Sequence, residues 1–426
     1  MAGASAAVRA AAAEPAVPTP GQVEWQDMEV EMFLCLDPCT WQGRESDDHS
    51  TPVDRIDPDR LDTDQWAETA RSMGAGQILF VAKHSGGFCW WQTRTSGYGV
   101  KETPWRGGKG DVVKDLAASC RKAGLKLALY LSPHDDMFGA GVAGRCKTPE
   151  AQAKYNEVFR AQWTELLNRY GEVSEVWFDG SSVIDVGGIL ARHCPDAMVF
   201  QSTRATIRWV GNEDGIAPDP CWNAVPLAAA RGGVATARDG TPDGGVWLPV
   251  ECDARLRSGW FWHPDNEPTL KSLEQLMRMY ERSVGHGAVL LLNNAPDTSG
   301  LIPKADVRRS AEFGAEVRRR FGRSAGEARG EGDTVELRLP RAAAFDRAIT
   351  AEDIRSGERV REYRIEALAA GEWKELARGT AVGHKKIDAF PLAAAERVRF
   401  RAVEAAGRPL IRKLAVYDTR TNKEEA

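Results

Sequence analysis

The sequence lacks the signatures of several common protein classes. Its eight cysteines and seven histidines form no CxxC pair and no closely spaced Cys/His motif, so we expect no structural zinc site. No apolar run approaches the ~20 residues that a bilayer-spanning helix needs. The formal net charge of −5 argues against nucleic acid or an anionic membrane surface as the main partner. The sequence also contains no internal repeat and no heptad pattern.

What the sequence does contain is typical of a soluble globular protein with two parts. Hydrophobic residues make up 42% and charged residues 27%, and 426 residues are enough for a large unit with a smaller companion. The 14 tryptophans against seven tyrosines are compatible with sugar binding, since indole faces stack on sugar rings, although most tryptophans in any protein are core residues. The even number of cysteines permits disulfides, but several lie in apolar segments where buried free thiols are common.

The first 21 residues differ in composition from the rest. They are rich in alanine and proline, which predicts a disordered segment. Small residues near Ala12 and Ala13 resemble the end of an export leader, but Arg9 interrupts the apolar run and no basic region precedes it. The pattern favours a periplasmic or secreted protein with a truncated leader. A disordered extension of a cytoplasmic protein is the alternative.

Between residues 22 and 322, short apolar runs alternate with amphipathic helical stretches. Nearly continuous hydrophobic runs are typical of parallel strands buried on both faces. Residues 62–74 and 109–124 have helical spacing, with an aspartate at the start and a glycine at the end. Eight apolar runs separated by helices predict a (β/α)8 TIM barrel, with a doubly wound sheet as the alternative. The predicted strands are residues 32–36, 77–83, 125–132, 175–180, 197–202, 207–212, 245–251 and 288–293.

The character of the sequence changes after Gly322. Residues 323–332 are rich in glycine and charged residues, and we interpret them as a linker. Residues 333–420 contain short runs of alternating polarity, which predict a C-terminal antiparallel β-sandwich. Residues 421–426 are polar and are expected to form a frayed tail.

In a barrel of parallel strands, catalytic groups lie at the carboxyl ends of the strands. Several predicted strands end in carboxylates, amides or a histidine, with tryptophans nearby, and this set favours hydrolysis of a glycosidic bond. Asp179 is the candidate nucleophile, because it follows the apolar run EVWF and precedes Gly180, which permits a tight turn. The alternative is an aspartate that caps the next helix.

A retaining glycosidase needs a second carboxyl group, about 5–5.5 Å from the nucleophile, to protonate the leaving oxygen. Glu213 is the candidate, since Trp209 and Val210 nearby are apolar and would raise its pKa. Glu251, again after an apolar run and near a tryptophan, is the alternative acid/base. A solvated loop carboxylate without a catalytic role is the other interpretation of Glu213.

The remaining candidate residues would contact the sugar. His84, after the second predicted strand, is suited to donate hydrogen bonds to hydroxyl groups, although a lone histidine there often binds a loop carbonyl. Trp90 and Trp91 are candidates for a stacking platform, with packing in the core as the alternative. The other candidates are Tyr130, His134, Trp177, Trp209, Asp37 and Cys35.

Several ordered motifs resemble the α-L-fucosidase family, glycoside hydrolase family 29. The stretch KHSGGFCWW (83–91) resembles the family's KHHDGFCLW, and EVWFDG (175–180) is similar to the segment that holds its nucleophile. RWVGNE (208–213), WFWHPDN (260–266) and SVGHGAVLLLNNAPDTSGLIP (283–303) resemble other blocks of the family. Together with the opening segment, the motifs extend over roughly residues 18–322. Such coverage makes the match much more specific than any single motif.

The resemblance implies a (β/α)8-like barrel with a C-terminal β-sandwich. It also implies retaining release of α-L-fucose or a closely related sugar from oligosaccharides or glycoconjugates, without a metal or organic cofactor. By motif, Asp179 matches the nucleophile, and Glu213 matches the acid/base of the linkage-selective branch.

The chain departs from the family pattern at three positions. Ser85 and Gly86 replace a histidine and an aspartate, and Cys35 stands where a sugar-binding histidine is usual. Each lost hydrogen bond to a sugar hydroxyl costs about 1–3 kcal/mol, so these departures imply an altered sugar pocket. A catalytically weak sugar-binding barrel, a glycosidase for another sugar, and an inverting enzyme therefore stay open as alternatives. The oligomeric state is not fixed by the sequence.

Overall fold

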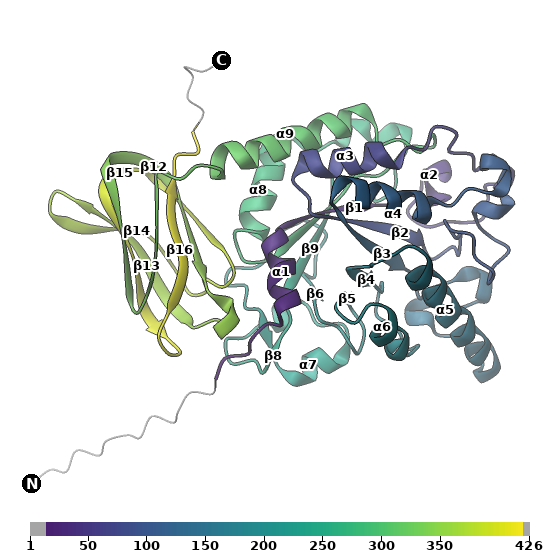
Figure 1. The fold of residues 1–426 in the computed structure, drawn as a ribbon, viewed down its shortest axis with the longest axis horizontal. Helices are drawn as coiled ribbons and strands as arrows, with labels where there is room; N and C mark the ends of the chain where they lie inside the picture. Colours follow the sequence, from purple (N-terminus) through teal and green to yellow (C-terminus); the bar gives the residue numbers. More distant parts are fainter. Residues whose placement is uncertain (1–13, 421–426) are drawn as a thin grey trace, which may run out of the picture.

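The computed structural model describes residues 14–420, and the larger part of the described chain is a barrel of parallel strands (Figure 1). The expected leader segment 1–21 falls mostly outside these residues, as does the expected tail 421–426. Residues 20 and 21 already belong to a helix, because Thr19 caps its first turn and Pro20 fits its first position. The barrel strands are β1 (Val30–Leu34), β2 (Gln77–Lys83), β3 (Lys126–Leu131), β4 (Glu175–Trp177), β5 (Met198–Phe200), β6 (Arg208–Trp209), β9 (Val250–Arg255) and β10 (Val289–Asn293).

The strands follow one another around the barrel in the order of the sequence. β1 pairs in parallel with β2 on one side and with β10 on the other. A single parallel bridge between Phe200 and Ile207 joins β5 to the start of β6 and closes the ring. All eight strands therefore end at the same mouth of the barrel, and the expected (β/α)8 fold is confirmed.

Helices surround the barrel, and their ends carry the signals that the sequence predicts. Asp62 caps one helix by accepting from two backbone N–H groups, and Gly74 ends it with a φ of 89°. Asp111 and Gly124 play the same roles in the next helix. The helices are α1 (Pro20–Met28), α2 (Cys39–Gln42), α3 (Thr63–Met73), α4 (Val112–Ala123), α5 (Pro149–Arg169), α6 (Gly187–His193), α7 (Leu227–Gly232), α8 (Leu273–Ser283) and α9 (Lys304–Phe321).

Short 3-10 turns complete the connections: Val53–Arg55, Val100–Glu102, Trp105–Gly108, Asp136–Phe138, Val142–Gly144, Ala237–Asp239, Pro264–Thr269 and Ile354–Ser356. Within residues 14–420, no helix combines the length and the apolar character that crossing a bilayer requires.

The seventh barrel strand lies further along the chain than the sequence predicts. It is β9, Val250–Arg255, rather than residues 245–251. Pro249 has no N–H to donate, and the apolar residues before it form β8 (Val246–Trp247), which pairs with β7 (Ala224–Val225) in a separate antiparallel sheet. Glu251 is therefore the second residue of its strand, and Asp253 lies nearer the barrel mouth.

The smaller part is an antiparallel β-sandwich whose order is β11-β16-β12-β15-β13-β14. The long strands β12 and β15 pair with each other along most of their length, β16 joins the second half of β12, and β13 joins the second half of β15. A separate hydrophobic cluster forms the core of this part. The sandwich that the sequence predicts is confirmed. Its strands are β11 (Gly326–Glu331), β12 (Thr334–Glu352), β13 (Val360–Ala369), β14 (Glu372–Gly379), β15 (Lys386–Ala405) and β16 (Leu410–Tyr417).

The interpretation of residues 323–332 as a linker is wrong for most of the segment. Residues 326–331 form β11, an edge strand that pairs with β16. The glycines that indicated flexibility instead allow close packing. A Cβ at Gly326 would approach a side-chain atom of Leu339 to 2.5 Å, and one at Gly330 would meet Val335 at 3.2 Å.

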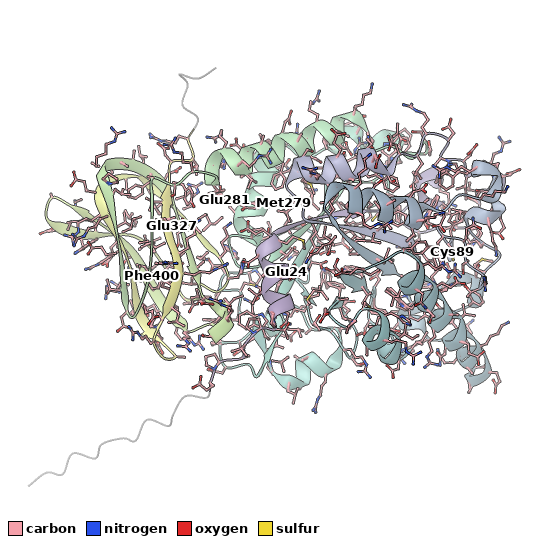
Figure 2. All side chains as sticks on the ribbon, viewed as in Figure 1. Glu24, Cys89, Met279, Glu281, Glu327 and Phe400 are labelled. Carbon is pink, nitrogen blue, oxygen red and sulfur yellow. The ribbon has the colours of Figure 1, made fainter. Side chains whose placement is uncertain are left out.

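The sandwich packs against the barrel near the amino ends of β1 and β10, beside α1, α8 and α9 (Figure 1). Glu281 of α8 lies at this junction (Figure 2). Its two carboxylate oxygens accept from Arg320 of α9 at 3.0 Å and from Arg347 of β12 at 3.2 Å, and its side chain is only 16% exposed. Sandwich residues also join the hydrophobic cluster of the barrel: Ile349, Ile387, Ala415 and Tyr417.

Glu281→Ala is expected to lower the free energy of unfolding by about 2 kcal/mol, because two arginines at a mostly buried junction lose their shared carboxylate. Urea unfolding followed by tryptophan fluorescence measures this change. Glu312→Ala is the matched control: Glu312 also pairs with two arginines, but its side chain is 41% exposed. A change below about 0.5 kcal/mol is expected for the control. Equal losses in both variants would contradict a role for Glu281 in joining the two parts.

Candidate active site

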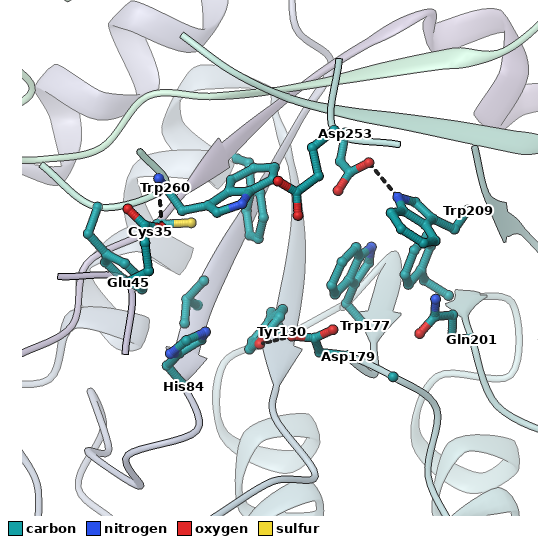
Figure 3. A pocket seen from close by; sticks show the side chains of 16 residues that line it. Cys35, Glu45, His84, Tyr130, Trp177, Asp179, Gln201, Trp209, Asp253 and Trp260 are labelled. Atoms are coloured by element: carbon teal, nitrogen blue, oxygen red, sulfur yellow. Dashed lines mark hydrogen bonds between the residues drawn. The ribbon is translucent and has the colours of Figure 1, made fainter. Parts of the chain in front are cut away.

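A cavity of about 270 Å³ opens at the carboxyl ends of the barrel strands (Figure 3). Seven of the eight strands, or the loops that follow them, contribute to its walls, as is usual for catalytic pockets of this architecture. The sandwich contributes none of the described lining residues. These are Phe33, Cys35, Glu45, Val81, His84, Tyr130, Trp177, Asp179, Gly180, Phe200, Gln201, Trp209, Glu213, Asp253, Trp260 and Phe261.

Asp179 lies two residues beyond β4, where the chain turns sharply. Gly180 and Ser181 both have positive φ angles, 71° and 68°, and the backbone N–H of Ser181 donates to Gln201 at 3.1 Å. The phenol of Tyr130 donates to Oδ2 of Asp179 at 3.0 Å (Figure 3). Asp179 caps no helix, since α6 begins only at Gly187. Its exposed carboxylate is therefore held by one directed hydrogen bond and faces the cavity.

Glu213 lies in the loop that follows β6. Asn212 shapes this loop, because its side chain accepts from the N–H of Asp214 and donates to the carbonyl of Ile216, both at 3.0 Å. The Glu213 carboxylate is 43% exposed and lies 3.4 Å from the guanidinium of Arg255. It lines the same cavity as Asp179, so the two carboxylates that the sequence singles out are brought together.

Asp253 is a third carboxyl group of the cavity that sequence reasoning missed. It is 4% exposed, and Trp209 donates to its Oδ1 at 2.7 Å (Figure 3). Burial, together with the nearby charges of Glu213 and Asp179, raises the pKa of Asp253 to about 7. The misplaced end of the seventh strand hid this residue, because a strand ending at residue 255 would have pointed to Asp253 rather than to Glu251.

Stacked aromatic rings form the floor of the cavity. Trp177 stacks on Phe200 with ring centres 3.9 Å apart and planes 4° apart, and on Tyr130 at 5.3 Å. Phe33 packs against Trp177 in a tilted contact at 5.8 Å and against Trp260 in a T-shaped contact at 5.7 Å. Such a surface offers apolar faces for a sugar ring and keeps bulk water out of the barrel interior.

A rim is built from side chains that the sequence analysis did not select. The backbone N–H of Trp260 donates to Glu45 at 3.0 Å, and Asn293 of β10 donates to the carbonyl of Trp260 at 2.7 Å. Arg255 lies over the Trp260 ring at 5.6 Å and also pairs with Glu213. The motif WFWHPDN contained Trp260, but only the fold reveals that its loop returns to the mouth of the barrel.

His84 and Cys35 occupy the wall next to the floor. The His84 ring stacks on Tyr130 at 5.9 Å and meets Phe261 edge-on at 5.1 Å. Burial lowers the pKa of His84, although the charge of Asp179 opposes this shift. Burial raises the pKa of the Cys35 thiol well above its usual range. At neutral pH both side chains are therefore uncharged and can contact a neutral sugar.

Four candidates from the sequence lie outside the cavity. Trp90 and Trp91 are fully buried core residues, and Trp91 donates to Glu165 at 2.9 Å. His134 pairs with Asp136 at 3.0 Å in the loop after β3. Asp37 is fully buried behind the wall that His84 forms. The sequence marks these residues as chemically suitable, but it does not show which way each side chain points.

Glu251 also lies outside the cavity, below the aromatic floor. It is fully buried, accepts from the indole N–H of Trp177 at 3.0 Å, and lies close to two further buried glutamates, Glu31 of β1 and Glu175 of β4. Gln77 bridges Glu31 and Glu175 with hydrogen bonds of 3.0 Å. Burial raises the pKa of all three carboxyls, to about 7 for Glu175 and well above the usual range for the other two. Glu251 thus supports the floor from beneath.

Comparison with known proteins places these observations in a family. The model of the Alpha-L-fucosidase family matches residues 48–319. Alpha-L-fucosidase 1 of Arabidopsis thaliana is 30% identical, and the match covers 95% of this chain and 88% of that protein.

Two solved structures extend the likeness to the fold. A glycoside hydrolase 29 family member from an unknown rumen bacterium is 31% identical, with a TM-score of 0.86 over 97% of this chain and 79% of that chain. A GH29 fucosidase from Ruminococcus gnavus, solved in complex with fucose, is 25% identical, with a TM-score of 0.84 over 98% of this chain and 97% of that chain.

Glu251→Gln tests whether the buried carboxyl is protonated. The raised pKa means that the folded chain keeps a proton that the unfolded chain releases above about pH 4.5. The resulting stability is complete below that pH and is lost as the pH rises through the folded-state pKa. Glutamine keeps the acceptor for Trp177 and has no proton to lose, so the variant should lose less stability than the wild type from about pH 5 to 9.

Thermal unfolding across this pH range measures the difference. Glu251→Ala serves as the control, because it removes both the acceptor and the proton and should be less stable than wild type at the acidic end of the range. Parallel curves for wild type and Glu251→Gln would contradict a protonated Glu251.

Proposed function

This chain belongs to the alpha-L-fucosidase family of glycoside hydrolases, and from that premise we propose that it releases a terminal α-L-fucose, or a closely related sugar, with retention of configuration. The observation that carries the proposal is the pair Asp179 and Glu213. These carboxylates come from different strands and face one cavity that is closed below by aromatic rings. Such a cavity accepts the end of a glycan rather than its middle, which makes the proposed hydrolysis exo-acting. An oligosaccharide or glycoconjugate is the proposed substrate.

In the first step, a carboxylate oxygen of Asp179 attacks the anomeric carbon and forms a covalent glycosyl-enzyme ester. The bond to the leaving oxygen breaks as Glu213 gives that oxygen its proton. The hydrogen bond from Tyr130 fixes the orientation of Asp179, and the contact with Arg255 restricts Glu213. Both groups are thus positioned before the sugar arrives, which reduces the entropy lost in reaching the transition state.

In the second step, Glu213 removes a proton from water, whose oxygen attacks the same anomeric carbon. The ester bond to Asp179 breaks and its electrons return to the carboxylate. Two inversions at one carbon give net retention. Glu213 ends protonated and Asp179 ends charged, so the enzyme returns to its starting state.

The cavity wall supplies the recognition of the sugar. Trp177 and Tyr130 offer ring faces, and His84 and Asp253 offer hydrogen-bonding groups for hydroxyls. Glu45 and Trp260 stand at the rim, where the group attached to the sugar would leave. A binding protein without turnover is the competing function, and the absence of hydrolysis of any activated glycoside would support it.

Asp179→Ala should reduce kcat for 4-nitrophenyl α-L-fucoside by at least about 10³-fold, because the variant cannot form the covalent intermediate. Sodium azide should restore turnover by filling the space of the lost carboxylate, and the product should be the β-fucosyl azide. Asp136→Ala is the control, since Asp136 pairs with His134 outside the cavity, and its activity should stay within about twofold of wild type. Unchanged activity of Asp179→Ala would place the nucleophile elsewhere.

Glu213→Gln should affect substrates according to their leaving groups. The loss should be at least about 10²-fold on a fucosyl disaccharide, whose leaving oxygen needs a proton, and smaller on an activated aryl fucoside in single-turnover experiments. Asp253→Asn is the matched comparison, because Asp253 also lines the cavity and burial raises its pKa to about 7. If the dependence on the leaving group appears in Asp253→Asn and not in Glu213→Gln, Asp253 is the acid.

A further inference from the structure

Behind the wall of the cavity, three side chains of different chemistry converge. Asp37 and Cys39 follow β1, and His84 follows β2 directly. These strands are paired neighbours, so the segments after them begin side by side at the barrel mouth. A carboxylate oxygen of Asp37, the sulfur of Cys39 and a ring nitrogen of His84 all lie within 4.8 Å of one another.

Within residues 14–420, no basic side chain pairs with the buried carboxyl of Asp37. Its residue is 0% exposed, and its Oδ1 has no hydrogen-bond partner among the described residues. Its Oδ2 accepts only a weak hydrogen bond from the Cys39 sulfur at 3.4 Å among side chains. The buried lysine that precedes His84 in the sequence, Lys83, pairs with Asp135 at 2.5 Å. A carboxyl group in such a position either keeps its proton or is paired with a cation or a metal ion.

A second aspartate, Asp47, lies near enough to Asp37 to act on its charge. Asp47 itself is held by Tyr98 at 2.7 Å and by Gln42 at 2.7 Å, and neither is a cation. The region is thus acidic and would be stabilised by positive charge.

We propose that Asp37, Cys39 and His84 bind a divalent transition-metal ion, and that zinc is the ion whose preferences they fit. One carboxylate oxygen, one thiolate and one imidazole nitrogen form a donor set typical of zinc, whereas calcium and magnesium prefer oxygen donors alone. Three protein ligands leave a fourth position open. Binding releases the thiol proton, and the ion gives the unpartnered Asp37 oxygen a partner.

The spacing explains why the sequence does not reveal such a site. The donors come from two segments 45 residues apart, since residue 84 minus residue 39 is 45, and Cys39 and Asp37 match no common zinc motif. The proximity arises from strand pairing. Two of the three departures from the family pattern flank the site: Cys35 lies just before Asp37, and Ser85 follows His84.

A metal ion here would act on the cavity through His84. The ring of His84 lines the cavity, whereas Asp37 and Cys39 do not. Coordination would fix the ring and place a positive charge beside a cavity lined by four carboxylates: Glu45, Asp179, Glu213 and Asp253. The site does not depend on the mechanism proposed above, and its test reads metal binding rather than hydrolysis.

The test uses the full-length protein, freed of metal with a chelator and titrated with Co²⁺ and with Zn²⁺ in separate experiments. We expect one equivalent of either ion to bind, and cobalt to give a thiolate charge-transfer band in the near ultraviolet. Zinc added to the cobalt form should remove the band. Affinity should rise with pH, because the thiol must lose its proton.

Two variants and a control make the result specific. Cys39→Ser should abolish the thiolate band, and Asp37→Asn should weaken zinc binding by at least about tenfold. Cys120→Ser is the matched control, because Cys120 is equally buried but lies on α4, and this variant should bind the metal as the wild type does.

Circular dichroism of the metal-free variants checks that each one folds. If Cys39→Ser does not fold, Asp37→Asn alone decides. No stoichiometric binding by the wild type, or a band that survives in folded Cys39→Ser, would overturn the proposal.

Discussion

The closure of the barrel between β5 and β6 is the constraint on which both the fold and the cavity depend. These are among the shortest strands of the ring, and a single backbone bridge joins them. Side-chain contacts therefore supplement the sparse backbone pairing in this part of the barrel. Trp177 stacks on Phe200 of β5 and on Tyr130 of β3, while its indole N–H binds Glu251 of β9 across the interior. The same contacts that hold the ring together form the surface on which a sugar would rest.

Most of the fold could be predicted from the sequence, because buried parallel strands leave long apolar runs and helices carry local capping signals. The seventh strand could not, since two apolar runs meet at Pro249 and local sequence does not say which of them joins the barrel. Because the predicted strand ended a few residues too early, Glu251 was selected as the residue at its end and Asp253 was overlooked. The prediction that Trp90 and Trp91 stack on a sugar was wrong for another reason: both are buried in the core. Residue type indicates what a side chain can bind, but only packing decides where it points. Asp179 and Glu213 were selected because each lies in the segment that follows an apolar strand.

The barrel contains two layers of carboxyl groups with opposite character. Below the floor, Glu31, Glu175 and Glu251 are sealed from water, and burial raises their pKa values, so that Glu31 and Glu251 keep their protons near neutral pH. Above the floor, Asp179 and Glu213 are exposed and remain available for reaction. The layer of aromatic rings thus separates carboxyl groups that support the structure from the two that are proposed to react with the sugar. The proposed metal ion would lie beside this boundary, where acidic groups are buried without a positive partner.

The aromatic floor also has a consequence for how such an enzyme meets a large substrate. Because the cavity is closed below, the proposed hydrolysis would act on a glycan only at its chain ends and would leave its internal units untouched. The rate of sugar release then follows the number of free tips in solution and not the mass of polymer. Sugar release from a densely branched glycan would be fast at first. It would stop once every branch ends in a different sugar. Further trimming would have to wait for other enzymes that remove the unit left behind.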